Sequence, residues 1–333
     1  MAISRKPKRF PPEYYVDGIL NHDRVILSQS ITLAESHLPS DQELSSLILD
    51  KLIPHSGNSI RIGITGVPGV GKSTFIEALG TKLTEEGKRL AVLAIDPSSQ
   101  RSGGSILGDK TRMVALAHNP NAYIRPSAAG RALGGVGFKT REAIIFCEAA
   151  GFDVIFVETV GVGQSETMVH GMVDFFLLLM LAGAGDELQG IKKGIMEMAD
   201  TIVINKADGE NEKMAKRAKV EYQNALHLFP PAENGWYPKV LTCSSLQKNG
   251  LDDVWHLIES YKTEMEQNGF FIKNRQEQNV NWMFDAVKFH LEQRFYSYES
   301  IQKAATELKR EVEAGVKAPI RAALELLRLY DVK

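Results

Sequence analysis

The sequence predicts an α/β fold, a doubly wound and mostly parallel sheet with helical extensions at both ends. Between residues 59 and 205, short and nearly continuous apolar runs alternate with stretches of helical periodicity. Continuous apolar runs are typical of strands covered on both faces, and their alternation with helices predicts a parallel sheet. The predicted strands are 59–65, 89–95, 153–159, 175–181 and 201–205, and the helices between them include 72–86, 138–150 and 190–199.

The first 55 residues predict helices and no strand. The run "SDQE" at 40–43 is typical of a capping box, in which Ser40 accepts the amide of residue 43 and Glu43 reaches back. Leu44, Leu47 and Ile48 then fall on one face of the helix that follows.

After about residue 268 the strand pattern stops and three or so amphipathic helices are expected. Composition alone leaves open whether these helices cover the sheet or reach a second subunit. Their apolar positions keep helical spacing at Val280, Met283, Phe284, Val287 and Leu291, and again at Ile320, Ala323, Leu324 and Leu327.

Length and composition limit the kinds of protein that this chain can be. The 333 residues suffice for one large domain with extensions or for two domains. The 41 acidic and 39 basic residues give no overall field that favours nucleic acid or a membrane. Cys147 and Cys243 form no disulfide framework and favour a reducing compartment. The longest apolar run, 175–185, is about half of a membrane span.

The motif "GVPGVGKST" follows the first predicted strand and opens a predicted helix. Its backbone N–H groups can surround phosphate oxygens, Lys72 can bridge the β- and γ-phosphates, and Ser73 can give its hydroxyl to Mg²⁺. The motif therefore predicts a P-loop NTPase. The expected phosphate-binding residues are Gly66, Val67, Pro68, Gly69, Val70, Gly71, Lys72, Ser73 and Thr74.

The motif "NKAD" at 205–208 follows another predicted strand and identifies the base. A carboxylate such as that of Asp208 can accept both the N1–H and the exocyclic amine of guanine, whereas adenine offers the reverse donor pattern. The expected nucleotide is therefore GTP or GDP. The other residues expected at the base are Asn205 and Lys206, with Ser244, Ser245 and the backbone of Leu246 from "CSSLQ" after the next predicted strand.

Carboxylates at strand ends are the candidates for the metal. Asp96, Asp109 and Glu158 lie at strand ends or in the loops that follow, and we assign them to Mg²⁺ together with Ser73, some through water. Gln164 is a candidate to orient the attacking water, although an Asn, another Gln or a backbone group elsewhere could serve.

Together, "GVPGVGKST", "AIDPSS", "GDKTRM", "ETVGVGQSE", "GAGDELQGIKKGI" and "NKAD" resemble one family. It is the MeaB/ArgK family of G-protein chaperones of adenosylcobalamin-dependent methylmalonyl-CoA mutase. The resemblance runs from about residue 20 to the C-terminal helices. It implies a SIMIBI-class GTPase that hydrolyses GTP to GDP and phosphate and so gates cobalamin loading and protection of the mutase.

The resemblance also implies roles for particular segments. Asp96 and Asp109 fall in the first switch region, 158–166 form the second and 183–194 resemble the third, which meets the mutase. Within the third, Lys192 is a candidate to pair with the acidic metal cluster and to act with Lys72, Glu158 and Gln164 in catalysis. The family is homodimeric through a C-terminal arm. The implied division is a helical extension at 1–55, a P-loop GTPase domain at 56–268 and a helical dimerisation arm at 269–333.

The implied partners are methylmalonyl-CoA mutase, or a related acyl-CoA mutase, and the cobalamin adenosyltransferase. The sequence contains no D-x-H-x-x-G motif, so cobalamin is expected to belong to the partners. No nucleic acid or membrane partner is expected. The absence of an obvious organellar presequence favours a bacterial, cytoplasmic protein.

Three other interpretations remain open at this level. One is a kinase of a periplasmic amino-acid-binding protein, the older meaning of the ArgK label. Another is a nickel-insertion GTPase, although the eight histidines are scattered and the cysteines are far apart. The third is a regulatory subunit that holds the mutase while hydrolysis is incidental.

Overall fold

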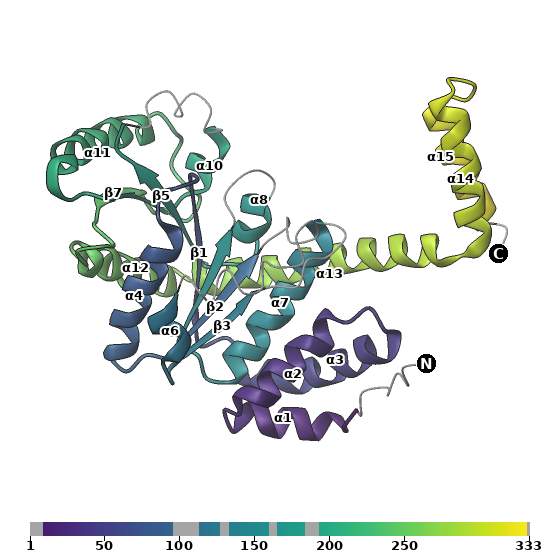
Figure 1. Cartoon of the computed structure of the whole chain (residues 1–333), viewed down its shortest axis with the longest axis horizontal. Coiled ribbons are helices and arrows are strands. Elements are labelled where there is room, and N and C mark those ends of the chain that lie inside the picture. Colours follow the sequence, from purple (N-terminus) through teal and green to yellow (C-terminus); the bar gives the residue numbers. More distant parts are fainter. Residues whose placement is uncertain (1–8, 96–112, 127–132, 160–164, 184–192, 332–333) are drawn as a thin grey trace. The chain divides into compact units, whose positions relative to one another are not determined.

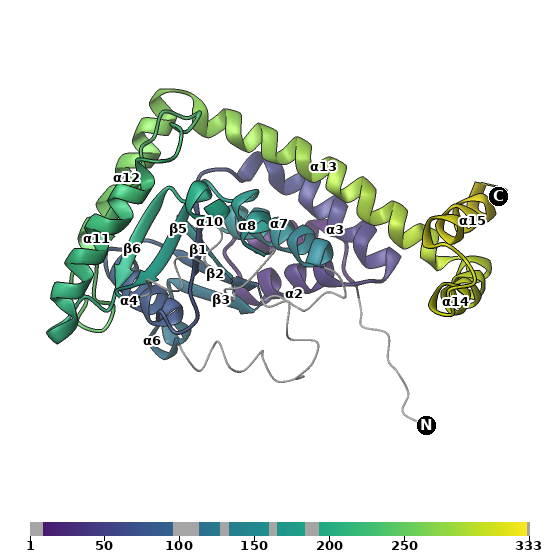
Figure 2. The same cartoon turned by 90° about the horizontal axis from the view of Figure 1, so that it is seen from above.

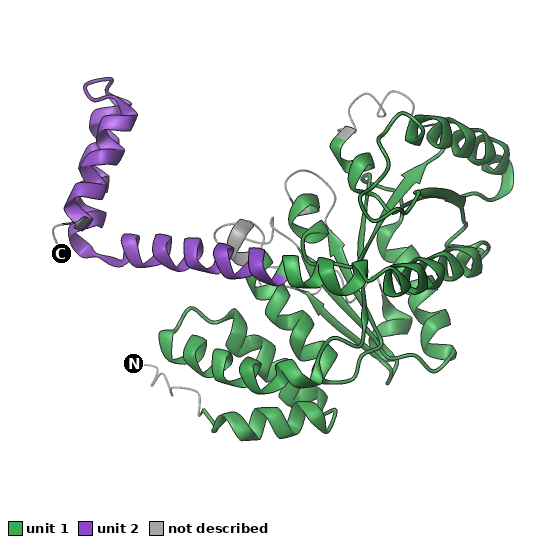
Figure 3. Ribbon diagram, turned by 180° about the vertical axis from the view of Figure 1, so that it is seen from behind, with its two compact units in different colours: residues 1–278 green, residues 279–333 purple. Residues whose placement is uncertain are grey.

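The computed structural model describes residues 9–95, 113–126, 133–159, 165–183 and 193–331. These form two compact units, residues 1–278 and residues 279–333 (Figure 3). No helix within the described ranges has both the length and the apolar character needed to cross a lipid bilayer.

The first unit contains a seven-stranded sheet in the order β3-β2-β4-β1-β5-β6-β7, and all the described strand pairs are parallel (Figure 1). This confirms the predicted α/β class. The strands are β1 (Ile60–Gly66), β2 (Leu90–Ile95), β3 (Ala122–Pro126), β4 (Val154–Thr159), β5 (Phe175–Leu181), β6 (Thr201–Asn205) and β7 (Lys239–Thr242). Strand β3 was not predicted from the sequence; it is a five-residue edge strand that ends in Arg125 and Pro126.

Helices cover both faces of the sheet, as its fully buried strands require (Figure 2). One apolar core lies under α4 (Lys72–Glu85), α6 (Val114–His118) and α12 (Leu251–Gln267). The opposite core lies under α7 (Leu133–Ala149) and α8 (Ser165–His170). A third cluster packs α10 (Lys193–Met198) and α11 (Glu212–Leu226) against β5, β6 and β7. The 3-10 turns are η1 (Ile53–His55) and η2 (Gly209–Asn211).

The N-terminal helices α1 (Pro12–Leu20), α2 (Arg24–Glu35) and α3 (Pro39–Leu52) share the core under α7. The expected capping box is wrong. Helix α3 begins one residue before Ser40, with Pro39 in its first turn and no side-chain cap. Leu47 is exposed, because Ile48 and Leu52 occupy the buried face together with Asp41, whose carboxylate accepts two hydrogen bonds from Arg9.

A buried ionic network joins the amino-terminal ends of β1 and β5 to the start of α13 (Phe270–Ser297). The fully buried carboxylate of Glu148 accepts two 2.9 Å hydrogen bonds from Arg61, and Asp174 accepts two of 2.7 Å from Arg275. The neighbouring guanidinium groups hold the pKa of Glu148 below its ordinary value despite its burial. The network therefore fixes the first turns of α13 to the end of the sheet opposite the strand carboxyl ends.

The second unit contains the rest of α13 with α14 (Glu299–Glu313) and α15 (Pro319–Asp331). Ile301, Leu308 and Ala322 form its small buried core. A larger set of apolar side chains on these helices is about half exposed or more in the single chain. On α13 the set comprises Val280, Met283, Phe284, Val287 and Leu291, and on α15 it includes Ile320, Leu324 and Leu327.

A buried carboxylate on α7 makes the stability of the fold depend on pH. Glu142 is 8% exposed, and burial raises its pKa from 4.5 to about 7 although Lys139 opposes the shift. Between these two pH values the folded chain binds more protons than the unfolded chain. The free energy of unfolding therefore falls as pH rises, and the penalty is complete above pH 7.

We expect the neutral variant Glu142→Gln to remove this penalty. At about pH 4, below both pKa values, the variant and the wild type should unfold almost alike, whereas at about pH 8.5 the variant should be more stable by roughly 2–3 kcal/mol. Urea unfolding followed by circular dichroism at both pH values measures the difference. The exposed Glu221→Gln is the control, and an equal effect of Glu142→Gln at both pH values would contradict the account.

Candidate nucleotide site

The phosphate loop connects the end of β1 to the first turn of α4, and two glycines shape it. A Cβ on Gly66 would lie 2.4 Å from the carbonyl oxygen of Leu179 on β5, so the strand can approach its neighbour only without a side chain. Gly71 has φ 91°, in the left-handed region that glycine tolerates. The loop therefore leads into the N-terminus of α4. No side chain caps the first backbone N–H groups of this helix, so they are available to a phosphate.

Lys72 and Ser73 occupy the first turn of α4. Lys72 Nζ donates a 2.9 Å hydrogen bond to the carbonyl of Gly66. Burial lowers the pKa of Lys72, and the charges of Glu158 and Glu166 oppose this only in part. The Ser73 hydroxyl donates to Glu158 Oε1 at 3.3 Å, so the helix start and the end of β4 converge. An ammonium held in a partly desolvated site favours a bound anion.

Glu166 belongs to this neighbourhood, although the sequence predicted for it only a place in the second switch region and no role of its own. Its side chain lies on α8, is 2% exposed and acts electrostatically on Lys72. The signal was present, because Glu166 ends the motif "ETVGVGQSE", but spacing alone does not say which acids of a loop are buried.

Asn205, at the end of β6, bridges two loops. Its Nδ2 donates to the carbonyl of Val70 in the phosphate loop at 2.9 Å. Its Oδ1 accepts from the backbone N–H of Ser245 at 3.1 Å and from the Ser245 hydroxyl at 2.8 Å. A Cβ on Gly71 would lie 3.2 Å from Asn205 Nδ2, so these loops are also in close contact. One amide thus joins the phosphate loop to the loop after β7.

Asp208 and Lys206 lie beside this bridge. The Ser244 hydroxyl donates to Asp208 Oδ2, which orients a half-buried carboxylate. Lys206 has φ 59°, and its Nζ donates to the carbonyl of Gly69 at 2.8 Å, so its side chain lies along the phosphate loop. Leu246 lies in the same loop as Ser244 and is 81% exposed.

The sequence-predicted residues divide into those that the structure brings together and those it does not describe. The phosphate loop, Glu158 and the 205–208 and 244–246 segments meet at the carboxyl ends of β1, β4, β6 and β7. Asp96, Asp109, Gln164 and Lys192 lie outside the described residues, and their roles stay predictions.

An all-parallel sheet with a phosphate loop after β1 and a base-recognition motif after β6 defines a P-loop GTPase. The family model described as Methylmalonyl Co-A mutase-associated GTPase MeaB matches residues 27–300. The chain belongs to this family, which confirms the resemblance seen in its motifs.

Named relatives and a solved structure agree with this assignment. A probable GTPase of Mycobacterium tuberculosis is 52% identical over 95% of this chain and 96% of its own length. A mouse protein named methylmalonic aciduria type A homolog, mitochondrial, is 42% identical over 99% of this chain and 81% of its length. A crystal structure of a LAO/AO transport system kinase superimposes with a TM-score of 0.74 at 38% identity, covering 96% of this chain and 97% of that one.

Proposed function

We propose that this GTPase is a nucleotide-driven switch that gates adenosylcobalamin loading into methylmalonyl-CoA mutase, or a related acyl-CoA mutase, and protects the loaded enzyme. The description of the matching family names the mutase. The main support for a switch is the Asn205 bridge. Because Asn205 bonds both loops, a movement of the phosphate loop would be passed to the loop after β7 through this one side chain. GTP and GDP differ by one phosphoryl group, so loops that contact it can report its loss. Adenosylcobalamin would bind to the partner proteins and not to this chain. A cobalamin adenosyltransferase would be one of these partners.

In the proposed reaction the chain mainly positions groups and stabilises charge. Lys72 would leave the Gly66 carbonyl for the β- and γ-phosphate oxygens, and residues 66–74 would supply N–H donors. Asp208 would accept the two guanine donors, with Asn205, Lys206, Ser244, Ser245 and Leu246 around the base. Gln164 would orient the attacking water, and Lys192 would neutralise acids near the metal.

Two residues, one at the start of α4 and one at the end of β4, fit a magnesium ion. Ser73 and Glu158 offer a hydroxyl and a carboxylate 3.3 Å apart, the hard oxygen donors that Mg²⁺ prefers. We propose that they hold the ion with Asp96 and Asp109, some through water. When bound, Mg²⁺ would offset the negative charge that develops on the phosphate oxygens.

We propose further that the second unit forms a homodimer with another copy of the chain. The exposed apolar side chains of α13 recur on one helical face, from Val280 to Leu291. Single chains rarely expose so continuous an apolar stripe without a partner, and paired copies usually bury the same surface on both.

The dimer proposal predicts a change in mass on substitution. Phe284→Lys with Val287→Glu should shift the sedimenting species from twice the chain mass to one 36.9 kDa chain, because charge replaces buried apolar area. Thermal unfolding of the first unit should not change. Lys288→Ala, on the same helix, is the control, and a wild type that sediments as a monomer would contradict the proposal.

The function is tested by capture from cell extract with the nucleotide fixed as GDP or a non-hydrolysable GTP analogue. Mass spectrometry should identify an acyl-CoA mutase whose recovery differs at least about fivefold between the two states. Transfer of adenosylcobalamin to that purified mutase should then require GTP hydrolysis. Equal recovery in both states, or transfer that ignores the nucleotide, would overturn the switch.

A transport-linked kinase is the second candidate, because the solved structure with a TM-score of 0.74 is that of a LAO/AO transport system kinase. A kinase of this kind would use ATP and label a protein substrate. Hydrolysis and binding measured with ATP and GTP side by side separate the two, since a clear preference for ATP defeats the GTPase switch.

A further inference from the structure

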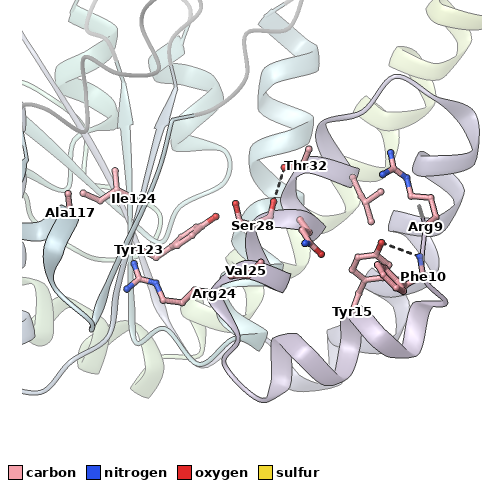
Figure 4. A pocket seen from close by; sticks show the side chains of 12 residues that line it. Arg9, Phe10, Tyr15, Arg24, Val25, Ser28, Thr32, Ala117, Tyr123 and Ile124 are labelled. Carbon is pink, nitrogen blue, oxygen red and sulfur yellow. Dashed lines mark hydrogen bonds between the residues drawn. The ribbon is translucent and has the colours of Figure 1, made fainter. Parts of the chain in front are cut away.

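A cavity of about 640 Å³ opens along helix α2, and its described lining includes none of the nucleotide-site residues that the structure places (Figure 4). Its lining includes Arg24, Val25, Ser28 and Thr32 of α2, which face the edge strand β3 through Tyr123 and Ile124. The α2 residues recur at each helical turn, so the cavity follows the helix for roughly 12 Å.

The floor of the cavity is apolar and aromatic. Tyr15 and Leu33 are each 3% exposed, and Tyr123 is 7% exposed. Burial raises the pKa of Tyr123 to about 12, so its hydroxyl stays protonated at neutral pH. Val25 is 65% exposed and stands at the rim. A ligand here would meet apolar walls below and polar groups at the edge.

The charges around the cavity do not cancel. Arg9 is paired with Asp41, and Arg125 behind the wall is paired with Glu35. Arg24 instead donates to the backbone carbonyls of Ala122 at 2.5 Å and Asn119 at 3.5 Å, and it has no carboxylate partner among the residues that the structure describes.

The neighbouring groups do not remove this positive charge. The carboxylate of Asp23 accepts from the N–H groups of Val25 and Ile26 at the start of α2, so it caps the helix. Arg24 and Arg89 are close enough that the charge of Arg24 contributes to a lowered pKa of Arg89. Two described hydrogen bonds use two of the five N–H donors of Arg24, and the residue is exposed.

We propose that this cavity binds a small organic anion whose aliphatic or aromatic body lies on the Tyr15, Leu33 and Tyr123 floor while its carboxylate, sulfonate or phosphate meets Arg24. The volume falls in the range of small-molecule sites, and the lining combines apolar walls with a few polar groups, as such sites do. A guanidinium is a strong partner for these anions because its bonds to them are charge-assisted.

The test uses two fluorescent probes that share an aromatic body. Anilinonaphthalene sulfonate carries the anionic group, and phenylnaphthylamine lacks it. Each probe is titrated into the full chain in the presence of saturating GDP and Mg²⁺. These fill the nucleotide site, so the probes cannot bind there. The methyl NMR signals of Val25, Leu33 and Ile124 report binding at this cavity and not elsewhere.

We expect both probes to shift these three methyl signals saturably, with the anionic probe binding more tightly. Arg24→Gln should weaken the anionic probe roughly tenfold and change the neutral probe less than about twofold. Val25→Trp, at an exposed position, should narrow the entrance and weaken both. Arg217→Gln, 84% exposed on α11, is the control, and GTP hydrolysis should stay within about twofold in every variant.

Two results would overturn the proposal. The first is probe fluorescence that saturates while the methyl signals of Val25, Leu33 and Ile124 stay in place, which would put binding elsewhere. The second is an anionic probe whose affinity is the same in the wild type and in Arg24→Gln.

Discussion

Lys72→Ala should lower GTP turnover at least about 100-fold while the fold survives. The ammonium that Lys72 would bring to the β- and γ-phosphates is preorganised in a partly desolvated site, where it stabilises the charge of the transition state most. Single-turnover phosphate release with saturating GTP and Mg²⁺ measures the loss.

The same variant separates catalysis from stability. Because burial lowers the pKa of Lys72, the folded chain without nucleotide holds that proton less tightly than the unfolded chain. Removing the ammonium should therefore leave the unfolding temperature of the nucleotide-free protein unchanged or slightly raised. The stabilisation by GDP should shrink. Lys213→Ala on α11 is the control, and turnover within tenfold of the wild type would sink the assignment.

Asp208→Asn should change the base that the site accepts. The carboxylate can accept both guanine donors, whereas an amide offers one donor and one acceptor, so GTP affinity should fall roughly 100- to 1,000-fold. Xanthine carries a carbonyl in place of the exocyclic amine, and the new amide can donate to it. Competition of GTP and XTP against a fluorescent guanine nucleotide measures the exchange.

The fold should tolerate this substitution because an amide oxygen can still accept from the Ser244 hydroxyl. Asp253→Asn, in the first turn of α12, is the matched control at an unrelated carboxylate. Unchanged GTP affinity in Asp208→Asn, or no gain in XTP binding, would show that another group reads the base.

The sequence predicted the centre of the sheet well and its edge poorly. Strands such as β4 and β5 are buried on both faces, so the apolar runs 154–157 and 175–181 within them contain no polar residue and can be recognised from the sequence alone. The edge strand β3 is different, because Arg125 reaches sideways to Glu35 and to Ser28 of α2. That stabilisation comes from a helix about ninety residues away and leaves no local pattern.

The nucleotide site shows the same contrast between local patterns, which can be predicted, and contacts between distant segments, which cannot. The phosphate loop could be predicted because its spacing is set by local backbone geometry. The bridging role of Asn205 could not, since it depends on loops that are distant in sequence and meet only in the folded sheet. The prediction of a capping box at Ser40 was wrong because α3 begins one residue earlier, at Pro39. The side chain of Asp41 is buried and bonds Arg9.

The amide of Asn205 has a consequence for how this protein could acquire a different nucleotide preference. Its oxygen and its nitrogen each bond a different loop, so a replacement that lacks either group breaks a contact to the phosphate loop or to the loop after β7. Asp208, the proposed base-reading carboxylate, has one described side-chain bond, to Ser244, so a change of base preference would disturb fewer contacts there. A lineage that lost Asn205 would therefore loosen both loops together before it could adjust either one to a new nucleotide.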